Sequence, residues 1–190
     1  MLSLTNSRNS LTTTFSTWLN LLGLLAICGS LLAAFYYQIV LNELPCPLCQ
    51  LQRVALILAG IGMLLNLRFG ASNIHYAMIL ASALVGAATS VRQVLLHIAP
   101  GDPGYGSALF GLHFYTWGFI SFVVMIAFCA LMLCVDRHPA KPSSRNTSGS
   151  IAHAAIILFL ILAATNTISS VMVCQFGSCP DNPTQYLWKF

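Results

Sequence analysis

The sequence predicts an all-α integral membrane protein, in which a four-helix transmembrane bundle is followed by a fifth transmembrane helix. Hydrophobic residues make up 57% of the 190 residues and charged residues only 6%, whereas about 25% of a soluble domain is charged. Five apolar runs are also long enough to cross a bilayer core of about 30 Å as helices. These runs are residues 18–40, 47–67, 76–98, 114–135 and 151–173.

The first run is expected to be a membrane helix rather than a cleaved signal sequence. It is longer than the apolar core of about 7–15 residues that signal sequences have. Residues 25–28 (LAIC) leave a lipoprotein cleavage box as an alternative, which the bulky Ile27 disfavours. The third run is interrupted only by Arg92 and Gln93 near its end, so it too is long enough to span.

The second run locates several polar residues near one membrane interface. Residues 54–67 alone are too short to span the bilayer, so this helix must begin at Pro47. Proline suits the first turn of a helix, because that turn needs no backbone N–H donor there. Cys46 is therefore predicted near the N-cap, with Cys49 and Arg53 inside the helix.

The basic residues predict the orientation of the chain in the membrane. In a five-helix zigzag, five of them fall on one side, namely Arg8, Arg68, Arg137, Lys141 and Arg145. By the positive-inside rule that side is cytoplasmic, so the N-terminus is expected in the cytoplasm and the C-terminus outside. The whole chain is then one membrane domain, with a cytoplasmic linker at residues 136–150 and a periplasmic tail at residues 174–190. The positive charge follows from this topology, and no nucleic-acid surface is expected.

The cysteines point to redox chemistry on the outer face. Of the seven, three fall in or at the inner ends of helices, where packing is expected of them: Cys28, Cys129 and Cys134. The other four form two closely spaced pairs on the outer side: Cys46, Cys49, Cys174 and Cys179. In a Gram-negative bacterium that side is the oxidising periplasm, where disulfides persist. The pattern therefore predicts two exchangeable disulfides.

The first pair has surroundings that favour a reactive thiolate. Cys46, Cys49 and Arg53 are spaced i, i+3, i+7, so they lie on one helix face. The positive end of the helix dipole and the arginine both favour the thiolate, which is the form that attacks disulfides and electrophiles. A cation within the membrane also requires a partner. A quinone, which is a flat, lipid-soluble electron acceptor with carbonyl oxygens, would provide one.

At these residues the chain resembles a known family. The segment LPCPLCQLQR is similar to the signature of the disulfide bond formation protein B (DsbB) family, a Cys-x-x-Cys followed four residues later by Arg. Segments 92–100 (RQVLLHIAP) and 110–118 (FGLHFYTWG) also resemble that family, so the resemblance extends over about residues 15–135. It implies a four-helix bundle of the bacterial inner membrane that oxidises the periplasmic thiol oxidase DsbA and reduces ubiquinone or menaquinone.

The resemblance also assigns roles to residues. It implies that Cys46 and Cys49 are the quinone-linked pair and that Arg53 contacts the quinone. His97 lies near the family's histidine at the end of the third helix, which implies a place in the same site.

The chain departs from the family in its second cysteine pair. Family members hold that pair between the third and fourth helices, where residues 99–113 of this chain contain no cysteine. We expect Cys174 and Cys179 to replace it, so that electrons pass from a partner thiol to this pair, then to Cys46 and Cys49, and then to quinone.

Two other interpretations remain open on the sequence. In one of them, the Cys174–Cys179 disulfide only stabilises the tail and takes no part in electron transfer. In the other, all four outer cysteines bind a structural zinc ion, and the protein is a non-catalytic membrane scaffold. We expect no metal site.

Overall fold

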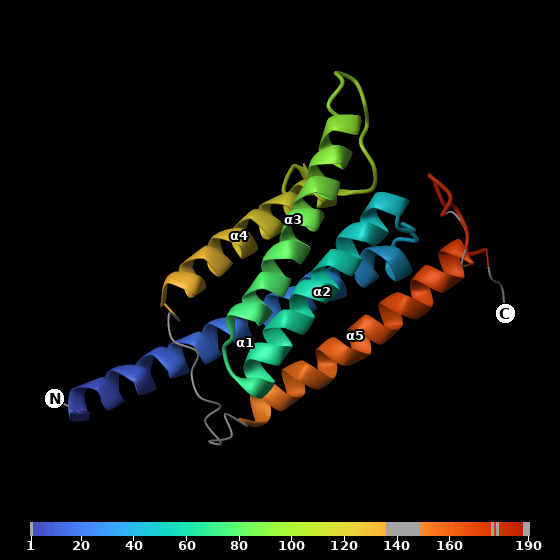
Figure 1. Cartoon of the computed structure of the whole chain (residues 1–190). Helices are drawn as coiled ribbons and strands as arrows, with labels where there is room; N and C mark the ends of the chain where they lie inside the picture. The colour runs from blue at the N-terminus through green and yellow to red at the C-terminus, as the bar shows by residue number, and fades with distance from the viewer. Residues whose placement is uncertain (1, 136–148, 176, 178, 188–190) are drawn as a thin grey trace.

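The computed structural model describes residues 2–135, 149–175, 177 and 179–187. This part of the chain contains five long helices (Figure 1), which are α1 (Leu2–Val40), α2 (Pro47–Phe69), α3 (Asn73–Leu96), α4 (Phe114–Val135) and α5 (Ser150–Cys174). Each contains a stretch that is long and apolar enough to cross a membrane. The predicted all-α fold with five membrane helices is therefore confirmed. Most of the predicted linker, residues 136–148, lies outside the described residues.

The first helix begins much earlier than the apolar run predicts. It begins at Leu2, although its membrane-spanning part begins only at Thr14. Residues 2–17 are mostly polar but contain neither glycine nor proline, so nothing in them ends the helix. Hydrophobicity alone therefore locates the membrane segment and misses the helical extension before it.

The bundle is centred on α2. It packs against α1, α3 and α5, while α4 packs against α3. Figure 1 shows α5 on the side of the bundle away from α4, where it also lies against α1. The start of α2 and the ends of α3 and α5 lie together at one end of the molecule, which we call the cysteine end because both outer cysteine pairs belong to it.

A short hairpin joins α3 to α4 at the cysteine end. Strand β1 (Ala108–Leu109) pairs in antiparallel fashion with β2 (Leu112–His113). Phe110 and Gly111 form the two-residue loop, with φ values of 53° and 80°, and positive φ at both positions is typical of a type I′ turn. This hairpin is not predicted from the sequence. Its turn places Phe110 at a positive φ, where phenylalanine is uncommon.

Glycines let the helices approach closely, so replacing one of them by alanine tests the packing. A Cβ atom at Gly86 of α3 would overlap the ring of Phe122 on α4, a fully buried side chain. We expect Gly86→Ala to destabilise the fold by about 1–3 kcal/mol through overpacking, seen as a lower midpoint of thermal unfolding in detergent. Gly29→Ala is the matched control, because its Cβ would meet nothing within 4 Å and alanine favours helix. Equal midpoints for both variants would contradict the packing described here.

Candidate redox site

The first cysteine pair lies at the start of α2, where the prolines place it. Cys46 is the N-cap residue in extended conformation, and its sulfur accepts a hydrogen bond of 3.1 Å from the backbone N–H of Cys49. Pro47 is the first helical residue, as its position in the sequence predicts. Cys46 and Cys49 form a disulfide with a Cα–Cα distance of 5.0 Å. Cys46 is buried and Cys49 half-buried, so Cys49 is the more accessible sulfur.

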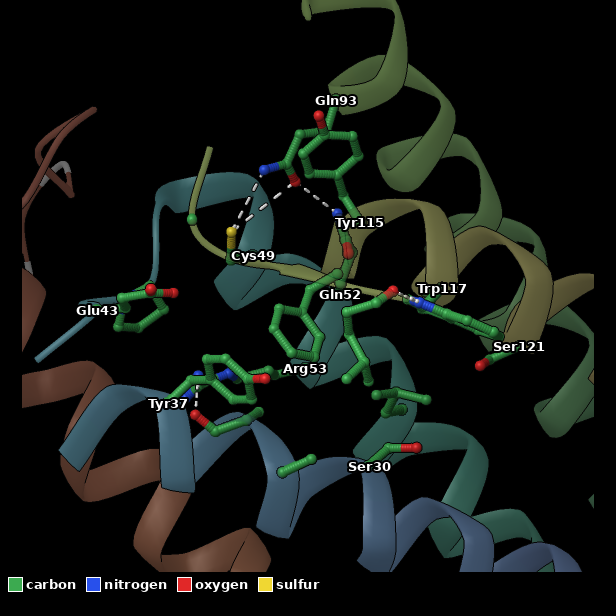
Figure 2. Close-up of a pocket in the computed structure, with 18 of the residues that line it drawn as sticks. Ser30, Tyr37, Glu43, Cys49, Gln52, Arg53, Gln93, Tyr115, Trp117 and Ser121 are labelled. Carbon is green, nitrogen blue, oxygen red and sulfur yellow. Dashed lines mark hydrogen bonds between the residues drawn. The ribbon is translucent and has the colours of Figure 1, made fainter. Parts of the chain in front are cut away.

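A glutamine of α3 donates to both sulfurs. Nε2 of Gln93 lies 3.4 Å from Sγ of Cys46 and 3.4 Å from Sγ of Cys49. Its carbonyl oxygen accepts a 2.8 Å bond from Nε2 of Gln52 on α2, which fixes the amide with its donor side toward the disulfide (Figure 2). Gln93 is only 1% exposed. Hydrogen bonds to a thiolate favour the charged form, so this donor adds to the helix N-terminus in stabilising it.

In the sequence, Gln93 stands out only as an interruption of an apolar run. The available signal was an uncharged polar residue buried in a membrane helix, which requires a hydrogen-bond partner. Nothing along the sequence indicated that its partners are the two sulfurs.

Arg53 is buried, and the groups that accept its hydrogen bonds in the described part of the chain are uncharged. Its Nη1 donates to Oε1 of Gln38 at 2.6 Å, and its Nη2 donates to the carbonyl of Ala34 at 3.1 Å. The guanidinium carbon also lies 5.5 Å from the ring centroid of Phe35. No Asp or Glu of the described chain forms an ion pair with it. The guanidinium has five N–H donors, so donors and a full positive charge remain for a ligand.

One cavity joins the cysteine pair to the arginine. It has a volume of about 480 Å³, and its lining includes Cys49, Gln52 and Arg53 from α2 and Gln93 from α3. Figure 2 shows these side chains around it. Its apolar wall comes largely from α2, α4 and the loop before α4: Leu56, Leu109, Phe114, Trp117 and Phe122. On α1 it is lined by Tyr37 and by small residues, namely Ala26, Gly29, Ser30, Ala33 and Ala34. A mostly apolar lining with a few convergent donors is typical of a small-molecule site.

Hydrogen bonds hold the α3–α4 loop against the rim of this cavity. The Glu43 carboxylate accepts from the backbone N–H of Ser107 at 3.0 Å and also from its hydroxyl. The hydroxyl of Tyr105 donates to the carbonyl of Leu44 at 2.6 Å. Burial, and secondarily the Glu43 charge, raise the pKa of Tyr105, so this hydroxyl keeps the proton that it donates.

His97 lies beside the cavity rather than in its lining. It is the C-cap residue of α3, with Nδ1 3.1 Å from Oδ1 of Asp102. A hydrogen bond from the Gly104 backbone, and then His97, lower the pKa of Asp102. The His97 ring stacks on Tyr115, which does line the cavity, at 5.7 Å between centroids. A direct contact of His97 with a ligand therefore stays a prediction.

The second cysteine pair closes the end of α5. Cys174 and Cys179 form a disulfide with a Cα–Cα distance of 4.4 Å, and both are half-buried. The helix ends on Gln175, whose φ of 47° is left-handed. One turn before Cys174, the hydroxyl of Ser170 donates to Oε1 of Gln50 on α2 at 3.0 Å.

The four outer cysteines are arranged in pairs. They form two separate disulfides, each within its own segment, and a disulfide sulfur is not the thiolate that zinc requires. Within the described ranges, no three His, Cys, Asp or Glu side chains are grouped as metal ligands.

Comparison with known proteins identifies the part of the chain that carries this site. Residues 16–106 match the family model described as "Disulfide bond formation protein DsbB". The match stops before α4, so segment 110–118 and α5 lie outside it.

Curated relatives match over a similar length. The chain is 44% identical over 90 residues to the disulfide bond formation protein B of Pseudomonas syringae pv. tomato, covering 45% of this chain and 52% of that protein. For the protein of the same name from Hahella chejuensis the identity is 37% over 91 residues, 45% of this chain and 55% of the relative. For that of Burkholderia pseudomallei it is 36% over 98 residues, with 49% and 58% covered.

The chain thus spans about half the length of the curated relatives that it matches. No solved structure matches it significantly. The part of the chain that is similar to the DsbB family, residues 16–106, contains the LPCPLCQLQR segment and with it Cys46, Cys49 and Arg53.

Proposed function

We propose that the protein is a membrane thiol:quinone oxidoreductase, which reoxidises a periplasmic DsbA-like thiol oxidase and passes the electrons to ubiquinone or menaquinone. One observation supports this above the others. Cys49 and Arg53 line the same cavity of about 480 Å³, so a redox-active sulfur and a cation with donors to spare face one apolar space. The names of the curated relatives support the disulfide-forming part of this activity.

The chemistry needs no group other than the thiols and the quinone. The reduced pair gives up two electrons and two protons as the Cys46–Cys49 bond forms, and the quinone takes up both to become the hydroquinone. Gln93 and the start of α2 stabilise the thiolate before the transfer. The N–H groups of Arg53 donate to the quinone oxygen on which negative charge develops.

The shape of the cavity suits a ring with a lipid tail. Its polar groups gather around Cys49, Arg53 and Gln93, where a quinone ring would find donors. The small side chains between Ala26 and Ala33 on α1 leave room for about 10 Å of chain along the helix. An isoprenoid tail is apolar and would lie along this part of the wall.

The tail pair is proposed to carry electrons from the partner to Cys46–Cys49. Helices α2 and α5 run in opposite directions, and Gln50 and Ser170 are hydrogen-bonded. Cys46 comes four residues before Gln50, and Cys174 comes four residues after Ser170. Because the helices are antiparallel, each cysteine lies about 6 Å from the Gln50–Ser170 hydrogen bond along its helix axis, toward the cysteine end. Cys46 and Cys174 therefore lie at a similar depth on contacting helices, which supports direct exchange between the two pairs.

The proposed orientation places the cysteine end in the periplasm of a bacterial inner membrane. The family and the five apolar helices support a membrane location. The orientation itself depends on the basic residues of the sequence, of which those between α4 and α5 lie outside the described residues.

A substitution in the tail tests the proposed route. We expect Cys174→Ser to block oxidation of a reduced DsbA-like partner, because the exchanging disulfide is lost. Quinone reduction driven by dithiothreitol should continue, because a small thiol can reach Cys49 in the cavity directly. Both rates are measured on the purified full chain. Partner oxidation at the wild-type rate would reduce the Cys174–Cys179 bridge to a structural role.

A further inference from the structure

The amide of Gln38 connects the arginine of the cavity to the C-terminal tail. Gln38 lies on α1 and is only 2% exposed. Its Oε1 accepts the 2.6 Å bond from Nη1 of Arg53. Its Nε2 donates on the opposite side to Oγ of Ser169 on α5 at 2.6 Å and to the hydroxyl of Tyr186 at 3.0 Å. The oxygen of this amide therefore bonds to the arginine, and its nitrogen bonds to α5 and the tail.

The orientation of this amide decides whether it can hold the arginine. If the amide turned over, its NH₂ group would face the guanidinium, and two donors would oppose each other. The donor-only guanidinium therefore fixes Oε1 toward itself, and the hydroxyl oxygens of Ser169 and Tyr186 hold the amide in place from the other side by accepting from its NH₂ group. Two residues outside the segment that matches the DsbB model thus support a contact within it.

Tyr186 belongs to the same tail as the second disulfide. The tail leaves α5 at Cys174 and returns to it, where the backbone N–H of Leu187 donates to the carbonyl of Met172 at 3.1 Å. Between these points lies the Cys174–Cys179 bridge. The bridge and Tyr186 therefore belong to the same tail segment. A movement of the tail that exposes the bridge for exchange would also shift Tyr186 relative to Gln38.

We infer that Gln38 is a positioning residue for Arg53, and that Tyr186 couples the position of the cysteine-bearing tail to the quinone cavity. This inference rests on the proposed function. While Tyr186 of the tail contacts Gln38, Gln38 holds Arg53 in place, with the remaining N–H donors of Arg53 available at the cavity. With the tail displaced, Gln38 loses one of the two acceptors that fix it, and the arginine is held less firmly.

The experiment measures quinone reduction with dithiothreitol as the electron donor and a short-chain ubiquinone as the acceptor, so that the tail disulfide is not needed for turnover. We expect Tyr186→Phe to raise the KM for the quinone about threefold to tenfold, as loss of one hydrogen bond predicts. The kcat at saturating quinone and the KM for dithiothreitol should stay unchanged. Tyr36→Phe is the matched control, because Tyr36 is 56% exposed on the same helix as Gln38.

A double-substitution cycle separates positioning from general loosening of the fold. We expect Gln38→Leu to raise the quinone KM by about tenfold or more, and Tyr186→Phe to add nothing further in that background. Additive effects, or a quinone KM in Tyr186→Phe equal to that of Tyr36→Phe, would overturn the inference. A wild-type protein that reduces no quinone would instead overturn the proposed function, so the two failures are distinguishable.

Discussion

Replacing Cys49 by serine is expected to reduce quinone turnover to the rate measured without protein, because the sulfur that lines the cavity is lost. Serine has nearly the same shape but neither forms a disulfide nor ionises at neutral pH, so the fold should persist while the chemistry ends. Cys46→Ser should have the same effect on turnover, since a single remaining thiol cannot deliver two electrons by closing a disulfide. The rate is followed as loss of quinone absorbance with dithiothreitol as donor.

Cys134→Ser is the matched control for this experiment. Cys134 is an exposed free thiol of α4 outside the site, so its replacement should leave turnover at the wild-type level. Persistent quinone reduction by Cys49→Ser would mean that the cavity sulfur takes no part in the reaction.

The second large effect is expected at Arg53. Arg53→Ala removes a buried cation that lines the cavity, and hydrogen bonds from a charged group contribute about 1.5–3 kcal/mol. We therefore expect the KM for quinone to rise about tenfold to a hundredfold. Alkylation of the reduced Cys49 thiol should continue, because the helix N-terminus and Gln93 remain beside it.

Two further variants separate the geometry of this side chain from its charge. Arg53→Lys should recover only part of the loss, since the compact ammonium of lysine does not reproduce the planar guanidinium fork that bonds to Gln38 and Ala34. Arg92→Ala is the control, because Arg92 is an exposed arginine near the C-terminal end of α3, which lies at the cysteine end. A quinone KM that is unchanged in Arg53→Ala would remove the arginine from the binding site.

The sequence predicts best what depends on local order. The length and hydrophobicity of the apolar runs identify the five helices, and the position of Pro47 identifies Cys46 as the N-cap. The spacing of Cys46, Cys49 and Arg53 predicts their shared helix face, and in the structure Cys49 and Arg53 do line one cavity.

The sequence predicts much less of what reaches the site from other helices. Membrane helices are apolar on nearly every face, so hydrophobic periodicity does not reveal which face turns inward. For that reason the positions of Gln38 and Gln93 against Arg53 and the cysteine sulfurs were not predicted. The contact of Tyr186 depends on how the tail folds back on α5, which no local pattern encodes.

The most direct test of the proposed electron route is a single turnover without oxygen. A Cys174→Ser/Cys179→Ser variant, fully reduced and freed of reductant, is mixed with one equivalent of short-chain ubiquinone. Hydroquinone is then measured by absorbance, and the thiol state of each cysteine by mass spectrometry after alkylation. We predict one hydroquinone for each Cys46–Cys49 disulfide that forms. Quinone that stays oxidised while Cys46 and Cys49 remain alkylatable thiols would contradict the account.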